Sequence, residues 1–167
     1  MIISALLMLS CSTSVKEDYT LLFNGKDLSG WNLLKPGGFE VIDGELVTRS
    51  SGSGTDIYTE KSYSNFILKL EFLLSDVGNS GIFIRRDPPK PGTGFEVQLL
   101  APWTPWRDDL HCTGSMYGHV AVSNRPDETT GKWYRMEIKC DRNIVTVSVD
   151  DQITTMADID TVKTMTG

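Results

Sequence analysis

The sequence lacks several features by which large functional classes are recognised. Its 167 residues carry a formal net charge of −6, and the missing excess of Lys and Arg argues against non-specific nucleic-acid binding. The three cysteines form no CxxC motif and no His/Cys cluster, so no zinc site is indicated. Glycine fingerprints of the Rossmann and P-loop types are missing, as are an internal repeat and extended helical periodicity. These absences do not exclude the binding of neutral ligands such as sugars.

Long hydrophobic runs are also missing, except at residues 1–10 (MIISALLMLS), which are too short to span a bilayer as a helix. Cys11 follows this run directly, and the order resembles a bacterial lipoprotein signal, although a basic start is missing and Met8 stands where Leu is usual. We therefore expect a lipoprotein signal over residues 1–11 ending at a lipidated Cys11, and a tether over residues 12–20. The protein would then be exported to the bacterial cell envelope, with membrane contact only through the lipid anchor. A plain secretory signal, or a buried terminal segment with an ordinary cysteine, is the alternative.

The two remaining cysteines are Cys112 and Cys140. Export would permit a disulfide, but the sequence alone does not place their Cα atoms close enough for one. Cys140 ends an alternating segment and is expected in the core. We therefore expect two free thiols.

Short alternating strands separated by turns dominate the rest of the chain. Fifteen glycines and seven prolines supply the turns, and Asp43-Gly44 joins two alternating segments in a pattern typical of a β-hairpin. The clearest strands are NFILKLEFLL (65–74), GIFIRR (81–86), FEVQLL (95–100), WYRMEIKC (133–140) and NIVTVSVD (143–150). Such strands, with turns about every 8–12 residues, predict one all-β domain over residues 21–167, a jelly-roll β-sandwich.

Three of these strands carry polar residues on the face opposite their apolar one, because residues two apart in a strand point the same way. The pairs are Lys69 and Glu71, Phe83 and Arg85, and Glu96 and Gln98. If the strands are neighbours in one sheet, the pairs form a patch of acids, bases and an amide. This patch is either a solvated outer face with cross-strand ion pairs or the floor of a substrate groove.

Aromatic residues near this patch favour the groove. Phe83 lies within the polar face, and the loop that follows Gln98 carries Trp103 and Trp106. Aromatic rings beside hydrogen-bonding groups suit sugars, which have apolar C–H faces and hydroxyl edges.

Both histidines of the chain lie in one segment, HCTGSMYGHV (111–120), with Tyr117 between them. Histidine carries protons near neutral pH. His119 is the stronger catalytic candidate and His111 the weaker one, although a surface histidine is often idle.

Six segments occur in an order that resembles the 3-keto-disaccharide hydrolase family over roughly residues 20–156. They are LFNGKDLSGW, FEVIDGELV, LKLEFLLSDVGNSGIFIRR, GFEVQLL, TGSMYG and GKWYRMEIKCDRNIVTVSVDD. The resemblance implies a concanavalin-like jelly roll, export in bacteria, and cleavage of glycosides whose sugar is oxidised at C3. TGSMYG departs from the family's TGAIYG. The chain also ends at Gly167, before the family's Gly-rich turn and last strand, so we expect a C-terminally incomplete jelly roll.

The implied substrate suggests a role for each candidate. A 3-keto group acidifies the C2 proton, and loss of the glycosidic oxygen from C1 is then a β-elimination, after which water can add back. The reaction needs a base, a partner for the enolate oxygen and a proton donor. Glu96 is our first candidate for the base, with His119 as the alternative, and Arg85 is expected at the enolate oxygen. Tyr117 or His119 would protonate the leaving oxygen. The expected sugar-binding residues are Gln98, Glu71, Tyr117, Trp103 and Trp106.

Two rival functions and one cofactor question stay open. A retaining β-glucanase needs two carboxylates about 5 Å apart, whereas the amide Gln98 stands beside Glu96 and cannot act as acid or nucleophile. A carbohydrate-binding module would use the same aromatics and amides without turnover. No cofactor or metal ligand set is assigned, although a divalent metal could replace Arg85 as the electrophile. We expect an enzyme that acts on an oligosaccharide or glycoside.

Overall fold

Strands make up almost all of the regular structure in the computed structural model, which describes residues 2–4, 19–48, 56–87 and 93–165. The elements are β1 (Ile2–Ser4), β2 (Trp31–Leu33), β3 (Phe39–Ile42), β4 (Glu45–Thr48), β5 (Ile57–Thr59), β6 (Phe66–Leu73), β7 (Asn79–Ile84), β8 (Phe95–Leu100), β9 (Trp133–Asp141), β10 (Ile144–Val149), β11 (Gln152–Asp158) and α1 (Ile159–Met165). The predicted all-β fold is confirmed.

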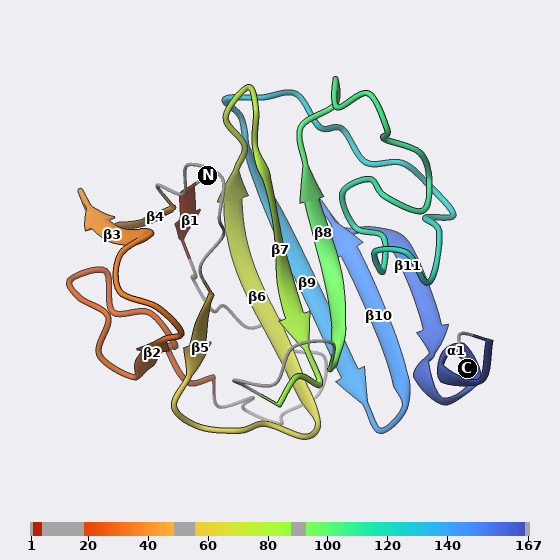
Figure 1. Cartoon of the computed structure of the whole chain (residues 1–167), viewed down its shortest axis with the longest axis horizontal. Helices are drawn as coiled ribbons and strands as arrows, with labels where there is room; N and C mark the ends of the chain where they lie inside the picture. The colour runs from red at the N-terminus through yellow and green to blue at the C-terminus, as the bar shows by residue number, and fades with distance from the viewer. Residues whose placement is uncertain (1, 5–18, 49–55, 88–92, 166–167) are drawn as a thin grey trace, which may run out of the picture.

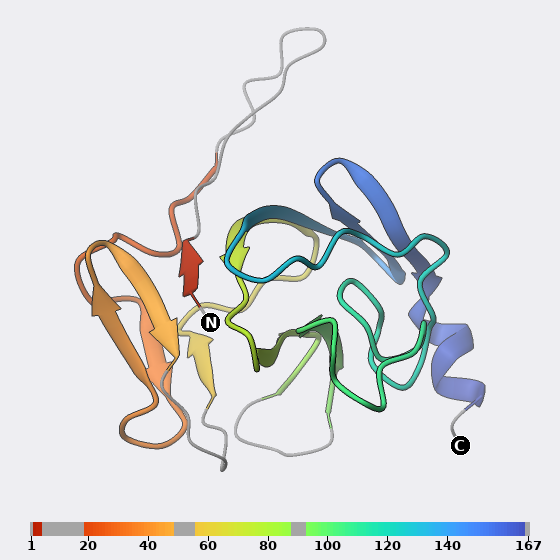
Figure 2. The ribbon, with the colours of Figure 1, turned by 90° about the horizontal axis from the view of Figure 1, so that it is seen from above.

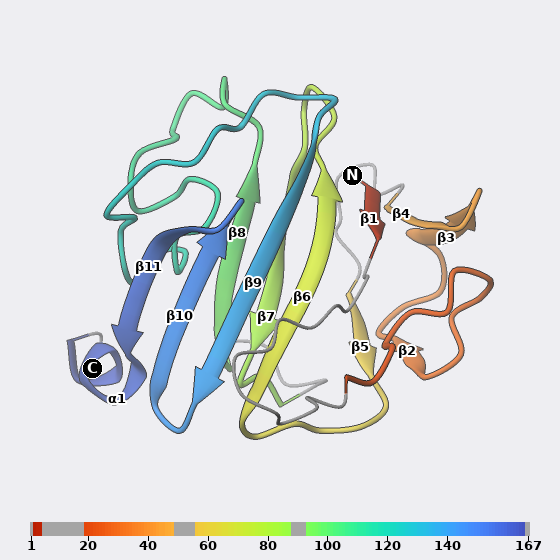
Figure 3. The same ribbon diagram turned by 180° about the vertical axis from the view of Figure 1, so that it is seen from behind.

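The strands form two layers. One antiparallel sheet has the order β11-β10-β9-β6-β1-β4-β3, β7 pairs with β8 in a second sheet, and β2 pairs with β5 in a third. The long strands β6, β9 and β10 lie side by side (Figures 1 and 3). Seen from above, β7 and β8 lie on one face of these strands (Figure 2). The molecule is therefore a β-sandwich, as the alternating pattern predicts.

Two-residue turns close the hairpins that the sequence indicates. Asp43 (φ 51°) and Gly44 (φ 85°) join β3 to β4, and positive φ at both central residues is typical of a type I′ turn. The hairpin predicted at Asp43-Gly44 is confirmed. β9 and β10 are also joined by two residues, Arg142 and Asn143, of which Arg142 has φ 54°.

The core lies between the long strands and the β7–β8 pair. Tyr134, Ile138 and Cys140 of β9 are buried, while their neighbours along the strand are more exposed. Val97 and Leu99 of β8 are fully buried in the same cluster. Burying each large apolar side chain stabilises the fold by roughly 1.5–3 kcal/mol, so the phase of these strands, and with it the outward face of β8, is strongly specified.

The segment between β8 and β9, residues 101–132, forms no strand but is bonded to both sheets. The Gln98 N–H donates to the Ser115 carbonyl at 3.0 Å, and the Gly114 N–H donates to the Gln98 carbonyl at 2.9 Å. From the other sheet, the Thr155 hydroxyl donates to the Gly114 carbonyl at 2.7 Å. Gly114 has φ +83°, and a Cβ there would lie 2.5 Å from the Thr154 hydroxyl oxygen, so only glycine fits. These contacts hold residues 111–120 against the edge of β8.

The structure describes only part of the segment predicted as a lipoprotein signal and tether. Ile2–Ser4 pair as β1 between β4 and β6. Residues 5–18, which include Cys11 and most of the expected signal and tether, lie outside the described residues. Within the described ranges, no helix is long and apolar enough to cross a membrane. Cys112 and Cys140 are buried free thiols, as predicted.

Candidate active site

A cavity of about 290 Å³ lies on the face of the β7–β8 pair that is turned away from the core. Its lining residues are Phe83, Arg86, Thr93, Gly94, Glu96, Tyr117 and His119. Three of the residues predicted for catalysis and binding, Glu96, Tyr117 and His119, therefore come together, although they come from β8 and from the segment that follows it.

Glu96 is half-buried and rests on the neighbouring strand. A Cβ atom at Gly81 would lie 2.3 Å from Glu96 Oε1 and 2.5 Å from its Cγ, so the carboxylate side chain occupies the space that a side chain on β7 would fill. Burial raises the pKa of Glu96, the negative charge of Asp56 raises it further, and the positive charge of Arg86 opposes the rise. Within the described residues, the Glu96 carboxylate accepts no hydrogen bond, and it is free to meet a ligand.

Arg86 supplies the positive charge of the pocket. Its Nη2 forms an ion pair with Asp56 Oδ2 at 2.9 Å, and its guanidinium carbon lies 4.4 Å from the centre of the Phe83 ring. The Arg86 Nε is buried and has no hydrogen-bond partner among the described residues. The guanidinium is thus fixed by one carboxylate and one ring and keeps an uncommitted donor.

Arg85, which the sequence analysis places in the site, lies elsewhere. Its backbone has φ 55° directly after β7 ends, and this left-handed residue breaks the alternation that would have put Arg85 beside Phe83. The Arg85 guanidinium instead donates to the carbonyls of Ser64 and Arg142, the latter at 2.7 Å. Strand periodicity extended past the end of the strand therefore placed Arg85 on the face of the cavity, whereas Arg86 is the arginine that lines it.

Gln98 does not line the cavity either. It is 1% exposed, and its amide Nε2 donates to Asn79 Oδ1 at 3.1 Å. Because this side chain is buried and absent from the cavity lining, the strand that was expected to offer both polar side chains to a ligand offers only Glu96.

Glu71 is separated from the site by the sandwich itself. A single patch requires β6, β7 and β8 to be neighbours, but β6 lies in the other sheet, between β9 and β1. Glu71 of β6 lies opposite Arg135 of β9, and it lines a different surface hollow with Lys69 and Glu137. The expected single patch is therefore two separate surfaces, because identical alternation does not reveal which sheet a strand joins.

Tyr117 and His119 are held beside Glu96 by a tight turn. The Tyr117 N–H donates to the Glu96 carbonyl at 2.9 Å, and the His119 N–H donates to the Met116 carbonyl at 2.8 Å. The His119 ring packs edge-on against Phe95, with 5.2 Å between the ring centres. Both side chains line the cavity together with Glu96, and both are of residue types that can donate a proton.

The two predicted tryptophans differ in their surroundings. Trp106 is 48% exposed and meets Tyr117 edge-to-face, with 6.4 Å between the ring centres. Trp103 is 53% exposed and makes no ring contact within the described part of the chain. Only Trp106 is connected to the cavity through a lining residue.

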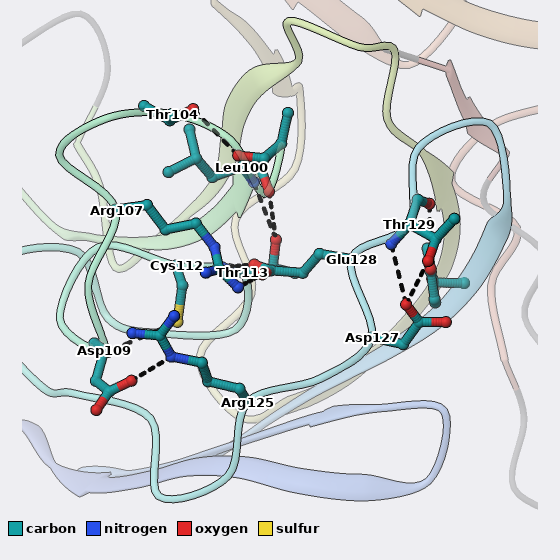
Figure 4. Close-up of polar contacts among 12 residues, drawn as sticks. Leu100, Thr104, Arg107, Asp109, Cys112, Thr113, Arg125, Asp127, Glu128 and Thr129 are labelled. Carbon is teal, nitrogen blue, oxygen red and sulfur yellow. Dashed lines mark hydrogen bonds and ion pairs between the residues drawn. The ribbon is translucent and has the colours of Figure 1, made fainter.

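A second acid–arginine group, invisible to the sequence analysis, fixes the loop that carries Tyr117 and His119 (Figure 4). Arg107 forms an ion pair with the buried Glu128, whose Oε1 accepts the Thr113 N–H at 2.8 Å. Arg125 pairs with Asp109 nearby. These contacts join three parts of the segment between β8 and β9 that lack regular structure.

Metal ligands are not concentrated at any point of the described ranges. Within them, no group of three or more His, Cys, Asp or Glu side chains could hold a metal ion. The cavity lining itself offers one carboxylate, Glu96, and one imidazole, His119.

The fold and the cavity define the class of protein first: a β-sandwich with a surface cavity on its smaller sheet. Crystal structures of candidate glycosyl hydrolases from Parabacteroides distasonis share this fold. One is 28% identical, with a TM-score of 0.70 over 83% of this chain and 71% of that one. Another is 24% identical, with a TM-score of 0.70 over 80% of this chain and 69% of that one.

The chain belongs to the 3-keto-disaccharide hydrolase family, because the model of the 3-keto-alpha-glucoside-1,2-lyase-like domain matches residues 18–167. No curated protein matched the sequence. The family expected from the sequence is confirmed, and family and fold together support a carbohydrate-active function.

Proposed function

We propose that this protein cleaves 3-keto-glycosides by removing the C2 proton and eliminating the group at C1. The observation that carries the proposal is the meeting of Glu96 and Arg86 in one cavity, where the arginine is held by Asp56 rather than by Glu96. An uncommitted carboxylate beside a fixed cation suits a reaction that removes a proton and creates a negative oxygen.

The steps follow from the substrate. Glu96 takes the proton from C2, and the electron pair of the broken C–H bond moves toward the C3 oxygen, where Arg86 stabilises the enolate. The enolate then re-forms the ketone, the C1–C2 double bond forms, and the bond from C1 to the leaving oxygen breaks. Tyr117 or His119 gives that oxygen its proton. Addition of water, with hydroxide at C1 and a proton at C2, completes a net hydrolysis.

The environment of Glu96 supports its assignment as the base. Because burial and Asp56 raise its pKa, the carboxylate holds a proton more tightly than an exposed glutamate and is the stronger base once ionised. His119 remains the alternative base. Both residues line the same cavity, so their positions do not decide which one is the base. Mutation of each residue distinguishes the two assignments.

The test compares two substrates and one variant. Wild-type protein is incubated with methyl 3-keto-α-glucoside and with methyl α-glucoside, and release of methanol is measured. We expect turnover of the keto sugar alone, and Glu96→Gln should reduce kcat by about 10³-fold in a protein with an unchanged circular dichroism spectrum. An undiminished kcat in Glu96→Gln would remove Glu96 from the role of base.

The same experiment separates the rival functions. Release of glucose from an unoxidised β-glucan, tested alongside, would indicate the retaining β-glucanase, which requires a second acid beside Glu96. Binding of both sugars without any turnover would indicate a carbohydrate-binding module.

We also propose export and lipidation at Cys11, which rest on residues 1–11 of the sequence. In the structure, Ile2–Ser4 pair with β4 and β6, an arrangement that a cleaved signal would abolish. The mass of the mature protein from bacterial envelopes tests the proposal: we expect acylation at Cys11 and loss of the residues before it. An unmodified mass that begins at Met1 would contradict it.

A further inference from the structure

A cluster of three rings extends from the cavity along the segment between β8 and β9. The His111 ring lies 4.8 Å from the Tyr117 ring, and Trp106 meets both rings edge-to-face at 6.4 Å between ring centres. Tyr117 is the member that also lines the cavity. The cluster therefore begins at the candidate active site and ends at the half-exposed Trp106.

The cluster is held in place rather than loosely packed. His111 Nδ1 lies 2.7 Å from Asp108 Oδ1, and the same carboxylate oxygen accepts the Leu110 N–H at 2.9 Å. The hydrogen bond from His111 lowers the pKa of Asp108, so the carboxylate stays ionised as its partner. A ring fixed in this way presents its surface without the entropy cost of ordering it when a ligand binds.

We propose that Trp106, backed by His111, forms the subsite for the leaving sugar, the second ring of the disaccharide that the family name gives as the substrate. The proposal rests on the proposed function, in which Tyr117 or His119 protonates the leaving oxygen. Because that oxygen must lie within reach of its proton donor, the group attached to it lies on the side of the cavity where these two residues stand, and Trp106 borders Tyr117 on that side.

The size of the cavity supports a ligand that extends beyond it. Its volume of about 290 Å³ is at the lower end of the range for small-molecule sites, roughly 300–1,000 Å³, and suits one sugar ring next to Glu96. A second ring must then rest outside the cavity. A half-exposed indole suits the apolar C–H face of a sugar, while the neighbouring imidazole and phenol can bind its hydroxyl edge.

Trp103 provides the matched control, because it lies in the same loop with nearly the same exposed fraction but takes no part in the ring contacts that join Trp106, His111 and Tyr117. The substrates are 3-keto-maltose, which has a sugar leaving group, and methyl 3-keto-α-glucoside, which has none. Trp106→Ala should lower kcat/KM for 3-keto-maltose by about tenfold, mainly through KM. Its kcat/KM for the methyl glycoside should stay within about twofold. Trp106→Phe should restore most of the loss, and Trp103→Ala should leave both substrates unaffected.

Three outcomes would overturn the subsite: equal losses for both substrates, no loss for either, or a loss in Trp103→Ala as large as in Trp106→Ala. Calorimetric titration with unoxidised maltose separates this failure from that of the proposed function, because it needs no turnover. If wild type binds maltose more tightly than Trp106→Ala while no keto sugar is cleaved, the subsite stands and the proposed chemistry fails. If keto sugars are cleaved but Trp106→Ala shows neither effect, the chemistry stands and the subsite fails.

Discussion

Two glutamates of this molecule meet an arginine in opposite ways. Glu128 is 4% exposed, forms an ion pair with Arg107 and also accepts a backbone N–H, so each of its two oxygens has a partner. Glu96 is half-buried beside Arg86, but that arginine pairs with Asp56. The first arrangement fixes a loop, whereas the second leaves a carboxylate uncommitted at a cavity. The difference is Asp56, which pairs with Arg86 and leaves Glu96 uncommitted, whereas Glu128 itself pairs with Arg107.

The largest effect on stability should come from breaking the buried pair. Arg107→Met leaves the Glu128 carboxylate buried without a counter-charge, which costs about 3–5 kcal/mol of unfolding free energy. Arg125→Met breaks the neighbouring exposed pair with Asp109 and should cost less than about 1 kcal/mol. Urea unfolding measures both values. Similar losses in the two variants would show that Glu128 is not the anchor of the loop.

The next effect concerns the arginine at the active site. Arg86→Gln removes the cation expected at the enolate oxygen and should lower kcat by about 100-fold, or about 2.7 kcal/mol. Arg85→Gln is the matched control, because its side chain binds backbone carbonyls of Ser64 and Arg142 away from the cavity. Its kcat should stay within about twofold of wild type. The opposite ranking of the two variants would restore Arg85 as the residue expected at the enolate oxygen.

A smaller effect should follow from filling the space in which Glu96 rests. Gly81 lies within β7, and a Cβ there would meet the Glu96 side chain at 2.3–2.8 Å. Since the obstructing atoms belong to a side chain that can turn away, Gly81→Ala should keep the fold and displace the carboxylate, lowering kcat by about tenfold. In a Glu96→Gln background the same substitution should cause no further loss. An equal loss in both backgrounds would show that Gly81 acts independently of Glu96.

The sequence predicts the sandwich well because alternation and turn chemistry act locally. The inward faces of β6 and β9 and the hairpin at Asp43-Gly44 all follow from neighbouring residues. The site is predicted less completely because it depends on relations between distant segments. Alternation does not say which sheet contains Glu71, and one residue with positive φ exchanges Arg85 for Arg86.

Two residues of the site are indicated weakly or not at all by the sequence around them. A glycine inside a strand often marks a close approach by another group, and Gly81 in NSGIF could have been read in that way. Asp56 follows the polar sequence SSGSGT (50–55), and nothing in its neighbours along the chain indicates that it holds Arg86.

The smallest expected effect is on the pH dependence of stability, which distinguishes Glu96 from Glu128. Because burial raises the pKa of Glu96, the folded protein binds more protons than the unfolded chain between the ordinary glutamate pKa and the raised one. Stability is therefore lost as the pH rises through this window. Glu96→Gln removes this loss, so its unfolding free energy should match that of wild type at pH 4 and exceed it slightly at pH 8. Glu128→Gln should lower stability at pH 8, because it takes the counter-charge from Arg107. Urea titrations at both pH values measure the signs, and a decrease at pH 8 in both variants would mean that the Glu96 carboxylate also has a structural partner.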